Sequence, residues 1–325
     1  MKVRIIPAYI GWIGLTPDMK GADLYHQSLK ARGASVFNRN SLAIKVLKRG
    51  LQIYPKARHF KFRNYLNNQS ENIWILDRII KELIDRLEYV YCYDEIDEAD
   101  INYYVNWHAF KGSTSGLDVA FFTHYEPRSK QTFFDVARSM DHCIFMSEKY
   151  RLEMRELNID TTSTIPLGVD LALFKPKLIL GCVGSFSQNE VRRERKGYDM
   201  IQALRGLDWI DVRITEGELN FSELPDFYRE LDYVLIPSSI EGGPMCVSES
   251  LACGIPVIAP PDVGAISEYD TGIINYTNGD FESLKAVLVE LYEKKLHLRQ
   301  SVEHLTWDNF ATRHDELFRW LTRNH

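Results

Sequence analysis

Short runs of apolar and β-branched residues alternate with amphipathic segments along most of this chain of 325 residues. Such a run between turn-forming residues is typical of a buried strand, and apolar residues that recur every three or four positions are typical of a helix. The clearest helices are predicted at 72–87, 128–139 and 307–321. Strands are predicted in two series, at 3–8, 88–93, 101–106, 118–123 and 142–147, and at 178–183, 209–215, 232–237, 255–259 and 272–276.

The alternation of strands and helices predicts an α/β protein built on parallel sheets. The two series are separated by a Pro- and Gly-bearing segment at about 168–176, which predicts two doubly wound, Rossmann-like domains at 1–173 and 174–306. The last amphipathic segment, 307–325, is expected to pack back on the first domain. In open α/β folds ligands bind at the carboxyl ends of the strands, so we expect two sheets that face a ligand-binding cleft between the domains.

The composition, with 45% hydrophobic and 26% charged residues, excludes a disordered or coiled-coil chain. No apolar run approaches the roughly 20 residues that span a bilayer. Lys2 and Arg4 precede an apolar stretch at 5–15, as in a secretory signal, but no small-residue cleavage site follows, which favours a buried strand. Five cysteines, an odd number and mostly within apolar runs, indicate reduced core thiols, so a cytoplasmic protein is expected.

Charge is distributed unevenly along a chain of net charge −6. Between Asp23 and Glu71 there are ten Lys and Arg residues and no acid. In this window Lys45, Lys48 and Arg49 lie on the polar side of an amphipathic segment that ends at a proline. Three interpretations remain open: a surface helix packed on the core, a helix on an anionic membrane surface, or a patch that binds DNA.

The most informative stretch begins at the end of a predicted strand, with Glu241, Gly242, Gly243 and Pro244, and continues into a predicted helix. Proline is favoured at the first position of a helix, and the amides and dipole of a helix N-terminus suit a phosphate. A second carboxylate, Glu249, lies inside that helix, so two carboxylates flank the predicted anion site. Carboxylates bind sugar hydroxyls well.

Three further features carry candidate chemistry. Gly184 follows the first strand of the second series, and Lys196 precedes a glycine that opens a helix, which favours phosphate binding over a solvated basic loop. His124 ends a strand, where a histidine is more often structural than functional. Glu126 is either a proton acceptor or a partner of Arg128, and His108 is a weaker candidate than His124.

These residues resemble the retaining glycosyltransferases of the GT-B fold, family-4 type (glycosyl transferases group 1), whose hallmark is two glutamates separated by seven residues. Glu241 and Glu249 have this spacing. Other matches occur in the family's order: the glycine loop at 21–23, the histidine segment at 123–124, and the stretches at 165–170, 183–199 and 224–228. The resemblance covers most of the chain, except about 39–106.

The resemblance implies roles for individual residues. The residues implied in catalysis are His124, Lys196 and Glu241. Those implied in donor binding are Gly21, Gly184, Arg193, Arg195, Gly242, Gly243, Pro244, Met245 and Glu249, and those on the acceptor side are Lys45, Lys48, Arg49 and Glu126. One position departs from the family: Ser185 stands where an arginine is usual, so Arg192, Arg193 or Arg195 would have to supply that cation.

The reaction implied is retaining transfer of a sugar from a nucleotide diphosphate sugar to an acceptor hydroxyl. No Asp-x-Asp motif stands in a suitable loop, so neither a metal nor a cofactor is expected. The expected acceptor is a cell-surface saccharide or a lipid-linked compound, with peripheral contact to the inner membrane face through the basic segment at 30–63. The alternatives are a phage-type DNA glycosyltransferase that acts on hydroxymethylated bases, a non-catalytic nucleotide-sugar-binding protein, and a GT-B epimerase. The lack of a G-x-G-x-x-G motif after the first strand argues against a dehydrogenase.

Overall fold

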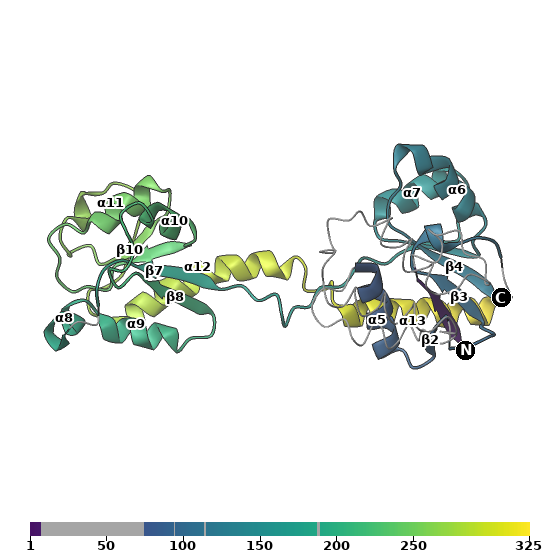
Figure 1. Cartoon of the computed structure of the whole chain (residues 1–325), viewed down its shortest axis with the longest axis horizontal. Helices are drawn as coiled ribbons and strands as arrows, with labels where there is room; N and C mark the ends of the chain where they lie inside the picture. The colour runs from purple at the N-terminus through teal and green to yellow at the C-terminus, as the bar shows by residue number, and fades with distance from the viewer. Residues whose placement is uncertain (8–74, 94, 114, 187–188) are drawn as a thin grey trace, which may run out of the picture. The chain divides into compact units, whose positions relative to one another are not determined.

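The chain forms two compact units, each built on one parallel sheet (Figure 1). The computed structural model describes residues 1–7, 75–93, 95–113, 115–186 and 189–325. The first unit comprises Met1–Asp170 and Leu305–His325, and the second comprises Leu171–His304. The chain therefore passes between the units twice, and its C-terminal segment belongs to the first unit.

The described strands of the first unit form a six-stranded sheet in the order β2-β1-β3-β4-β5-β6. All adjacent strands in this sheet are parallel. The register places Val3 of β1 opposite Val90 of β2 on one side and Ile101 of β3 on the other. The described elements of this unit are β1 (Val3–Ile6), α5 (Ile75–Arg86), β2 (Val90–Cys92), β3 (Ile101–Tyr104), η1 (Trp107–Ala109), β4 (Leu117–Phe122), η2 (Pro127–Ser129), α6 (Lys130–Arg138), β5 (His142–Phe145), α7 (Glu148–Glu156), β6 (Thr162–Thr164) and α13 (Trp307–Asn324).

Side chains that alternate along these strands build a separate core on each face of the sheet, because successive residues of a strand point to opposite faces. On β4, Phe121 packs in the core under α5 and α13, and Phe122 packs in the core under α6 and α7. Phe318 of α13 is fully buried in the first of these cores. The C-terminal helix, yellow in Figure 1, thus lies beside α5 on the unit that contains β1.

The second unit has a five-stranded parallel sheet in the order β11-β10-β9-β7-β8. The first two strands of this unit, β7 and β8, are neighbours, and the third, β9, lies on the other side of β7. The strand order therefore reverses between β7 and β9. The elements are β7 (Leu178–Cys182), α8 (Glu190–Arg195), α9 (Tyr198–Arg205), β8 (Ile210–Ile214), α10 (Leu224–Arg229), β9 (Tyr233–Leu235), α11 (Met245–Ala252), β10 (Val257–Ala259), η3 (Ile266–Glu268), β11 (Ile273–Asn275) and α12 (Phe281–Gln300).

The second sheet is also covered on both faces. Helices α9 and α12 bury Leu204 and Leu288 with Leu235 of β9 on one face, and α10 and α11 bury Tyr228 and Val247 with the neighbouring Val234 on the other. Figure 1 shows α10 and α11 together on one side of this sheet. The α/β class and the two Rossmann-like units predicted from the sequence are confirmed; the cleft between them stays a prediction.

Contacts within each unit hold the residues next to the points where the chain passes from one unit to the other. In the first unit the Val169 N–H donates to the Leu305 carbonyl at 2.7 Å, and a Cβ on Gly168 would meet the Trp307 nitrogen at 2.5 Å. In the second unit Arg299 of α12 donates to the carbonyls of Leu171 and Phe174 at 2.8 and 2.6 Å. The two crossings are therefore short segments, at 170–171 and 304–305.

All five cysteines are unpaired thiols, as predicted, and four of them are buried. Within the described ranges no helix combines the length and the apolarity needed to cross a membrane.

Candidate functional site

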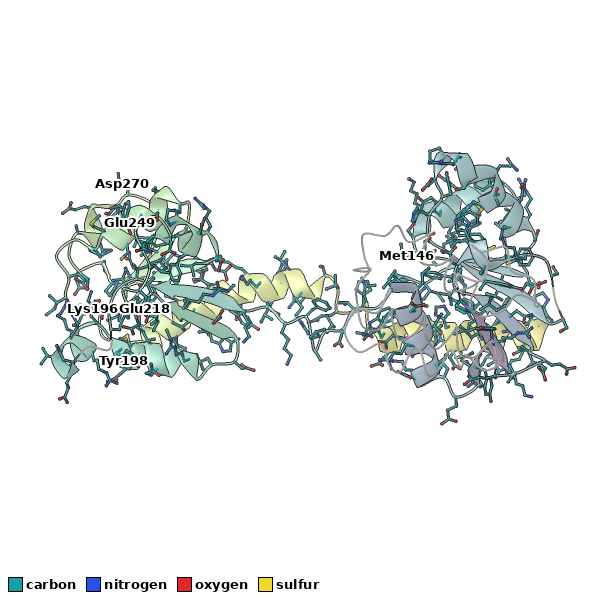
Figure 2. The ribbon with its side chains drawn as sticks, in the orientation of Figure 1. Met146, Lys196, Tyr198, Glu218, Glu249 and Asp270 are labelled. Carbon is teal, nitrogen blue, oxygen red and sulfur yellow. The ribbon has the colours of Figure 1, made fainter. Side chains whose placement is uncertain are left out.

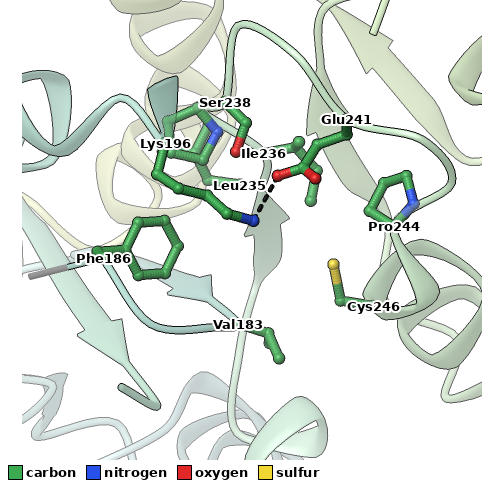
Figure 3. A pocket seen from close by; sticks show the side chains of 10 residues that line it. Val183, Phe186, Lys196, Leu235, Ile236, Ser238, Glu241, Pro244 and Cys246 are labelled. Atoms are coloured by element: carbon green, nitrogen blue, oxygen red, sulfur yellow. Dashed lines mark hydrogen bonds and ion pairs between the residues drawn. The ribbon is translucent and has the colours of Figure 1, made fainter. Parts of the chain in front are cut away.

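A pocket lies at the carboxyl ends of β7 and β9, where the strand order of the second sheet reverses. This is the position at which open α/β sheets bind their ligands, because the loops after the two strands separate there. The pocket is small, with about 20 Å³ of space for water-sized atoms. Its lining comes from the ends of β7 and β9, the start of α11 and the α8–α9 junction: Val183, Phe186, Lys196, Leu235, Ile236, Pro237, Ser238, Glu241, Pro244 and Cys246 (Figure 3).

Lys196 and Glu241, both predicted as catalytic, face each other across this pocket (Figure 3). The Lys196 ammonium donates a short hydrogen bond to Glu241 Oε1, and the two side chains are 18% and 15% exposed. Arg195 Nη1 lies 3.5 Å from Glu241 Oε2 and donates to the Ile240 carbonyl at 2.8 Å. One carboxylate thus has two cationic neighbours.

The surroundings of Glu241 stabilise its charged form. Partial burial alone would raise the pKa of this carboxyl, but hydrogen bonds from Lys196 and Ser238 and the charges of Lys196 and Arg195 outweigh it. The pKa of Glu241 therefore lies below its ordinary value. At neutral pH the pocket contains a carboxylate.

The segment that carries the cations is joined to the loop after β9 by close backbone contacts. Gly197, with φ +67°, precedes α9, and a Cβ built on it would meet the Pro237 carbonyl oxygen at 2.2 Å. The Ser239 N–H donates to the Arg195 carbonyl at 2.9 Å. Only glycine fits this approach, so the glycine after Lys196 sets the position of Lys196 against the loop that carries Glu241.

Helix α11 begins beside the pocket, one residue later than the sequence predicted. Pro244 has an extended backbone (φ −69°, ψ 112°) and is the N-cap, so the first helical residue is Met245, which is 70% exposed. Proline fixes only φ, and here ψ is extended rather than helical. Gly242 and Gly243 form the preceding loop and are exposed. The positive end of the helix dipole is thus directed toward the pocket, as an anion site requires.

Glu249 lies on α11, farther along the helix than the pocket-lining residues. Figure 2 labels Glu249 on this helix. Glu249 accepts a hydrogen bond of 2.7 Å from the hydroxyl of Tyr228, whose ring belongs to the core under α10 and α11. Burial first, and then the hydrogen bond to Glu249, raise the pKa of Tyr228. Glu249 therefore has a fixed donor on one side.

Two backbone amides in the loop after β7 already donate hydrogen bonds to side chains of the same unit. Gly184, with φ +132°, donates its N–H to Thr215 Oγ1 at 2.9 Å, and the Phe186 N–H donates to Glu216 Oε2 at 3.1 Å. Both acceptors follow β8, and Glu216 itself has φ +48°. An anion could therefore use these two amides only by displacing Thr215 or Glu216.

Two of the arginines considered as replacements at Ser185 have different surroundings. Arg195 lies beside Glu241, as described above, whereas the Arg193 guanidinium stacks over the Tyr198 ring at 4.4 Å. Of these two, Arg195 is the one that reaches a residue of the pocket. Ser238, which is 3% exposed, and Cys246 also line the pocket and were not predicted. Only their positions, after a strand end and in the first turn of a helix, could have indicated them.

The acceptor-side candidates belong to the first unit. His124 is exposed after β4, and its carbonyl accepts a hydrogen bond from the buried Trp107 indole at 3.3 Å. His108 stacks on Trp107, and burial, followed by the nearby charges of Lys111 and His124, lowers its pKa to about 4. Glu126 pairs with Arg128 at 3.2 Å, and both side chains are exposed.

The remaining predicted residues, Gly21, Lys45, Lys48 and Arg49, lie outside the described residues. Among the residues that the structure does describe, no group of three or more His, Cys, Asp or Glu side chains is arranged to hold a metal ion.

Residues 177–294, which include the whole pocket, match the family model of the glycosyl transferases group 1. This part of the chain is a glycosyltransferase domain. The resemblance and the enzyme class predicted from the sequence are confirmed with it. No curated protein matches the chain significantly.

Three of the solved structures similar to the chain are the following. Sucrose-phosphate synthase from Thermosynechococcus elongatus is 16% identical with a TM-score of 0.31, and 70% of this chain and 75% of that chain are covered. HepE of Anabaena, in complex with UDP, is 13% identical with a TM-score of 0.29, and 98% and 100% are covered. The UDP-forming trehalose-phosphate synthase from Burkholderia vietnamiensis is 11% identical with a TM-score of 0.27, and 65% and 64% are covered.

Proposed function

We propose that the chain transfers a sugar from a nucleotide diphosphate sugar to an acceptor hydroxyl with retention of configuration. One observation carries the proposal: Lys196 and Glu241 meet beside the start of α11, at the strand-order reversal of a glycosyltransferase domain. Cations and a helix N-terminus suit the diphosphate, and a carboxylate suits the sugar hydroxyls.

The charges of the pocket match those that the reaction develops. When the nucleoside diphosphate leaves, negative charge builds on its β-phosphate and positive charge builds at the anomeric carbon. Lys196, Arg195 and the first amides of α11 would stabilise the leaving group, because fixed donors that point at developing charge lower the barrier. We propose that Glu241 binds the donor sugar and that Glu249, oriented by Tyr228, binds the ribose hydroxyls.

No carboxylate in the proposed arrangement is free to attack the anomeric carbon, since Glu241 is assigned to the sugar hydroxyls. We therefore propose that the acceptor hydroxyl attacks on the face from which the diphosphate leaves. Glu241 and the cations would suffice without a metal ion. His124 is kept as an acceptor-side residue on the strength of the resemblance, with a saccharide or lipid-linked compound as the acceptor.

The direct test is a donor screen by thermal shift with UDP, GDP, ADP and their sugars, each measured with Mg²⁺ and with EDTA. A ligand that binds only the native state at a hundred times its Kd stabilises it by about 2.7 kcal/mol, so one nucleotide series should raise the Tm clearly. The rise should be equal in Mg²⁺ and EDTA. It should disappear in Lys196→Met and persist in Glu268→Gln, an exposed acid of the same unit.

A Tm unchanged by every nucleotide would rule out the donor site. A rise that requires Mg²⁺ would contradict the metal-free mechanism alone. With the donor known, the anomeric configuration of the transferred sugar is measured by NMR, and an inverted centre would exclude retention. The acceptor class is tested by liposome flotation with anionic vesicles and by DNA gel shift, each repeated with Lys45, Lys48 and Arg49 changed to Glu.

A further inference from the structure

Glu241 offsets part of the positive charge of the two cations that the donor phosphates would need. Its carboxylate contacts the ammonium of Lys196 through one oxygen and lies 3.5 Å from the guanidinium of Arg195 through the other. The three side chains are 36% exposed or less, so solvent screens these contacts only in part. A diphosphate that arrives at Lys196 and Arg195 must therefore compete with a carboxylate already in place.

The outcome of that competition depends on whether a sugar is attached to the diphosphate. An intact nucleotide sugar brings hydroxyl donors, which give the Glu241 carboxylate new partners when it leaves the cations. A nucleoside diphosphate has no sugar on its β-phosphate, and its ribose hydroxyls are assigned to Glu249, so a displaced Glu241 carboxylate would lose charge-assisted hydrogen bonds without replacement.

The surroundings of Glu241 allow this exchange. Gly264 lies close to the backbone of Glu241 and Gly242, since a Cβ built on Gly264 would meet their carbonyl oxygens at 2.9 and 2.6 Å. The exchange therefore calls for rotation of the Glu241 side chain and not for movement of this backbone. Arg195 also donates to the Ile240 carbonyl at 2.8 Å, a hydrogen bond that does not involve the Glu241 side chain and that would help to hold the guanidinium when the carboxylate turns away. The carboxylate can turn while one of its cations keeps a second partner.

We propose that Glu241 is an internal competitor of the diphosphate: it turns to the sugar hydroxyls when the donor binds and returns to Lys196 and Arg195 after transfer. The returning carboxylate weakens the hold on the nucleoside diphosphate and promotes its release, a step that often limits turnover. The inference rests on the proposed function and adds a product-expelling role to the residue assigned to sugar binding.

The test is calorimetric titration of the full-length protein with UDP, GDP and ADP and with UDP-glucose, GDP-mannose and ADP-glucose. Wild type, Glu241→Gln and the control Glu268→Gln are compared at low salt. Because Glu241→Gln removes the competing charge, it should bind the nucleoside diphosphate about two- to fivefold more tightly, the range that an ion pair open to solvent on one side supports. Its affinity for the nucleotide sugar should be unchanged or lower, and the gain should shrink at high salt.

The change in the ratio of the two affinities separates competition from a structural role, because damage to the pocket would weaken both ligands together. The inference is overturned if folded Glu241→Gln binds the nucleoside diphosphate no more tightly than wild type. If the Gln variant does not fold, Glu241→Asp replaces it; its shorter carboxylate should give a smaller gain of the same sign, and no gain overturns the inference. If the variant shows no gain while wild type binds nucleotides, the inference fails and the proposed function stands. If no nucleotide binds any of the proteins, the proposed function fails as well.

Discussion

Replacing Gly197 by alanine should damage the second unit more than the same change at another left-handed glycine. Gly197 has φ +67°, and a Cβ at this position would lie 2.2 Å from the Pro237 carbonyl oxygen. Gly254, just after α11, has φ +78° and nothing within 4 Å of the same built atom. The two positions share the backbone conformation and differ in the space around it, so Gly254→Ala is a matched control.

The expected loss of stability has two sources, the left-handed backbone conformation and the close contact with the Pro237 carbonyl. An L-residue in the left-handed region costs roughly 1–2 kcal/mol, and both variants bear that cost. A carbon and a carbonyl oxygen ordinarily approach to about 3.3 Å, so in Gly197→Ala the Pro237 carbonyl must retreat by about 1 Å. Backbone shifts forced by an added methyl cost typically 1–3 kcal/mol. We expect Gly197→Ala to destabilise the second unit by about 2–5 kcal/mol and Gly254→Ala by about 1–2 kcal/mol.

The measurement is scanning calorimetry of the full chain, with hydrogen exchange of peptides that cover 195–200 and 235–241. A difference of 1 kcal/mol corresponds to about 3 °C in Tm for a unit of this size. Gly197→Ala should also weaken nucleotide binding, because the displaced Pro237 carbonyl belongs to the loop that carries Glu241 and approaches the residue next to Lys196. Equal losses of Tm in the two variants, with unchanged exchange around 237, would refute the claim that this contact positions Lys196.

Three further predictions concern single side chains. Burial lowers the pKa of His142 and His314 in the first unit to about 4. Both histidines are therefore neutral in the native state, and the free energy of unfolding is highest above pH 6.5, where they are neutral in the unfolded chain as well. As the pH falls from 6.5 to 4, the free energy of unfolding should decrease by up to about 3 kcal/mol per histidine. Urea unfolding at pH 7, 6 and 5 checks this, and a flat profile would contradict it. Tyr228→Phe should lower the free energy of unfolding by about 1–2 kcal/mol, because the hydrogen bond to Glu249 is lost. It should also weaken nucleotide binding a few-fold in titration calorimetry, and unchanged binding would argue against a ribose role for Glu249. Arg195→Ala should weaken nucleoside diphosphate binding more than Arg193→Ala, since Arg195 reaches Glu241 and Arg193 stacks on Tyr198; the reverse order would reassign the phosphate cation.

The sequence predicted strands well where burial makes their signal strong. Ten strands of the two sheets occur within the predicted ranges or one residue outside them, because strands covered on both faces are continuous apolar runs. The edge strand β6 was missed: its Thr-Ser-Thr sequence is only partly buried and carries no apolar pattern. The helix α7 was missed for the same reason, since Met154 is its one buried residue.

For the site, residue types were more predictable than contacts. The spacing of Glu241 and Glu249 and the glycine after Lys196 can be recognised along the chain, but the Lys196–Glu241 ion pair joins residues 45 positions apart. The hydrogen bonds from the Gly184 and Phe186 amides to Thr215 and Glu216 likewise depend on how β7 and β8 pair. Such contacts follow from tertiary structure, which local patterns do not encode.

The late position of α13 in the chain affects how the protein is made. Phe310, Phe318 and Leu321 complete the core of the first unit, yet they are synthesised only after the whole second unit. The second unit is one uninterrupted segment, 171–304, and can fold as soon as it is synthesised. During translation the first unit should therefore remain open to chaperones and proteases until residues 305–325 have emerged, so the unit that is begun first is completed after the second.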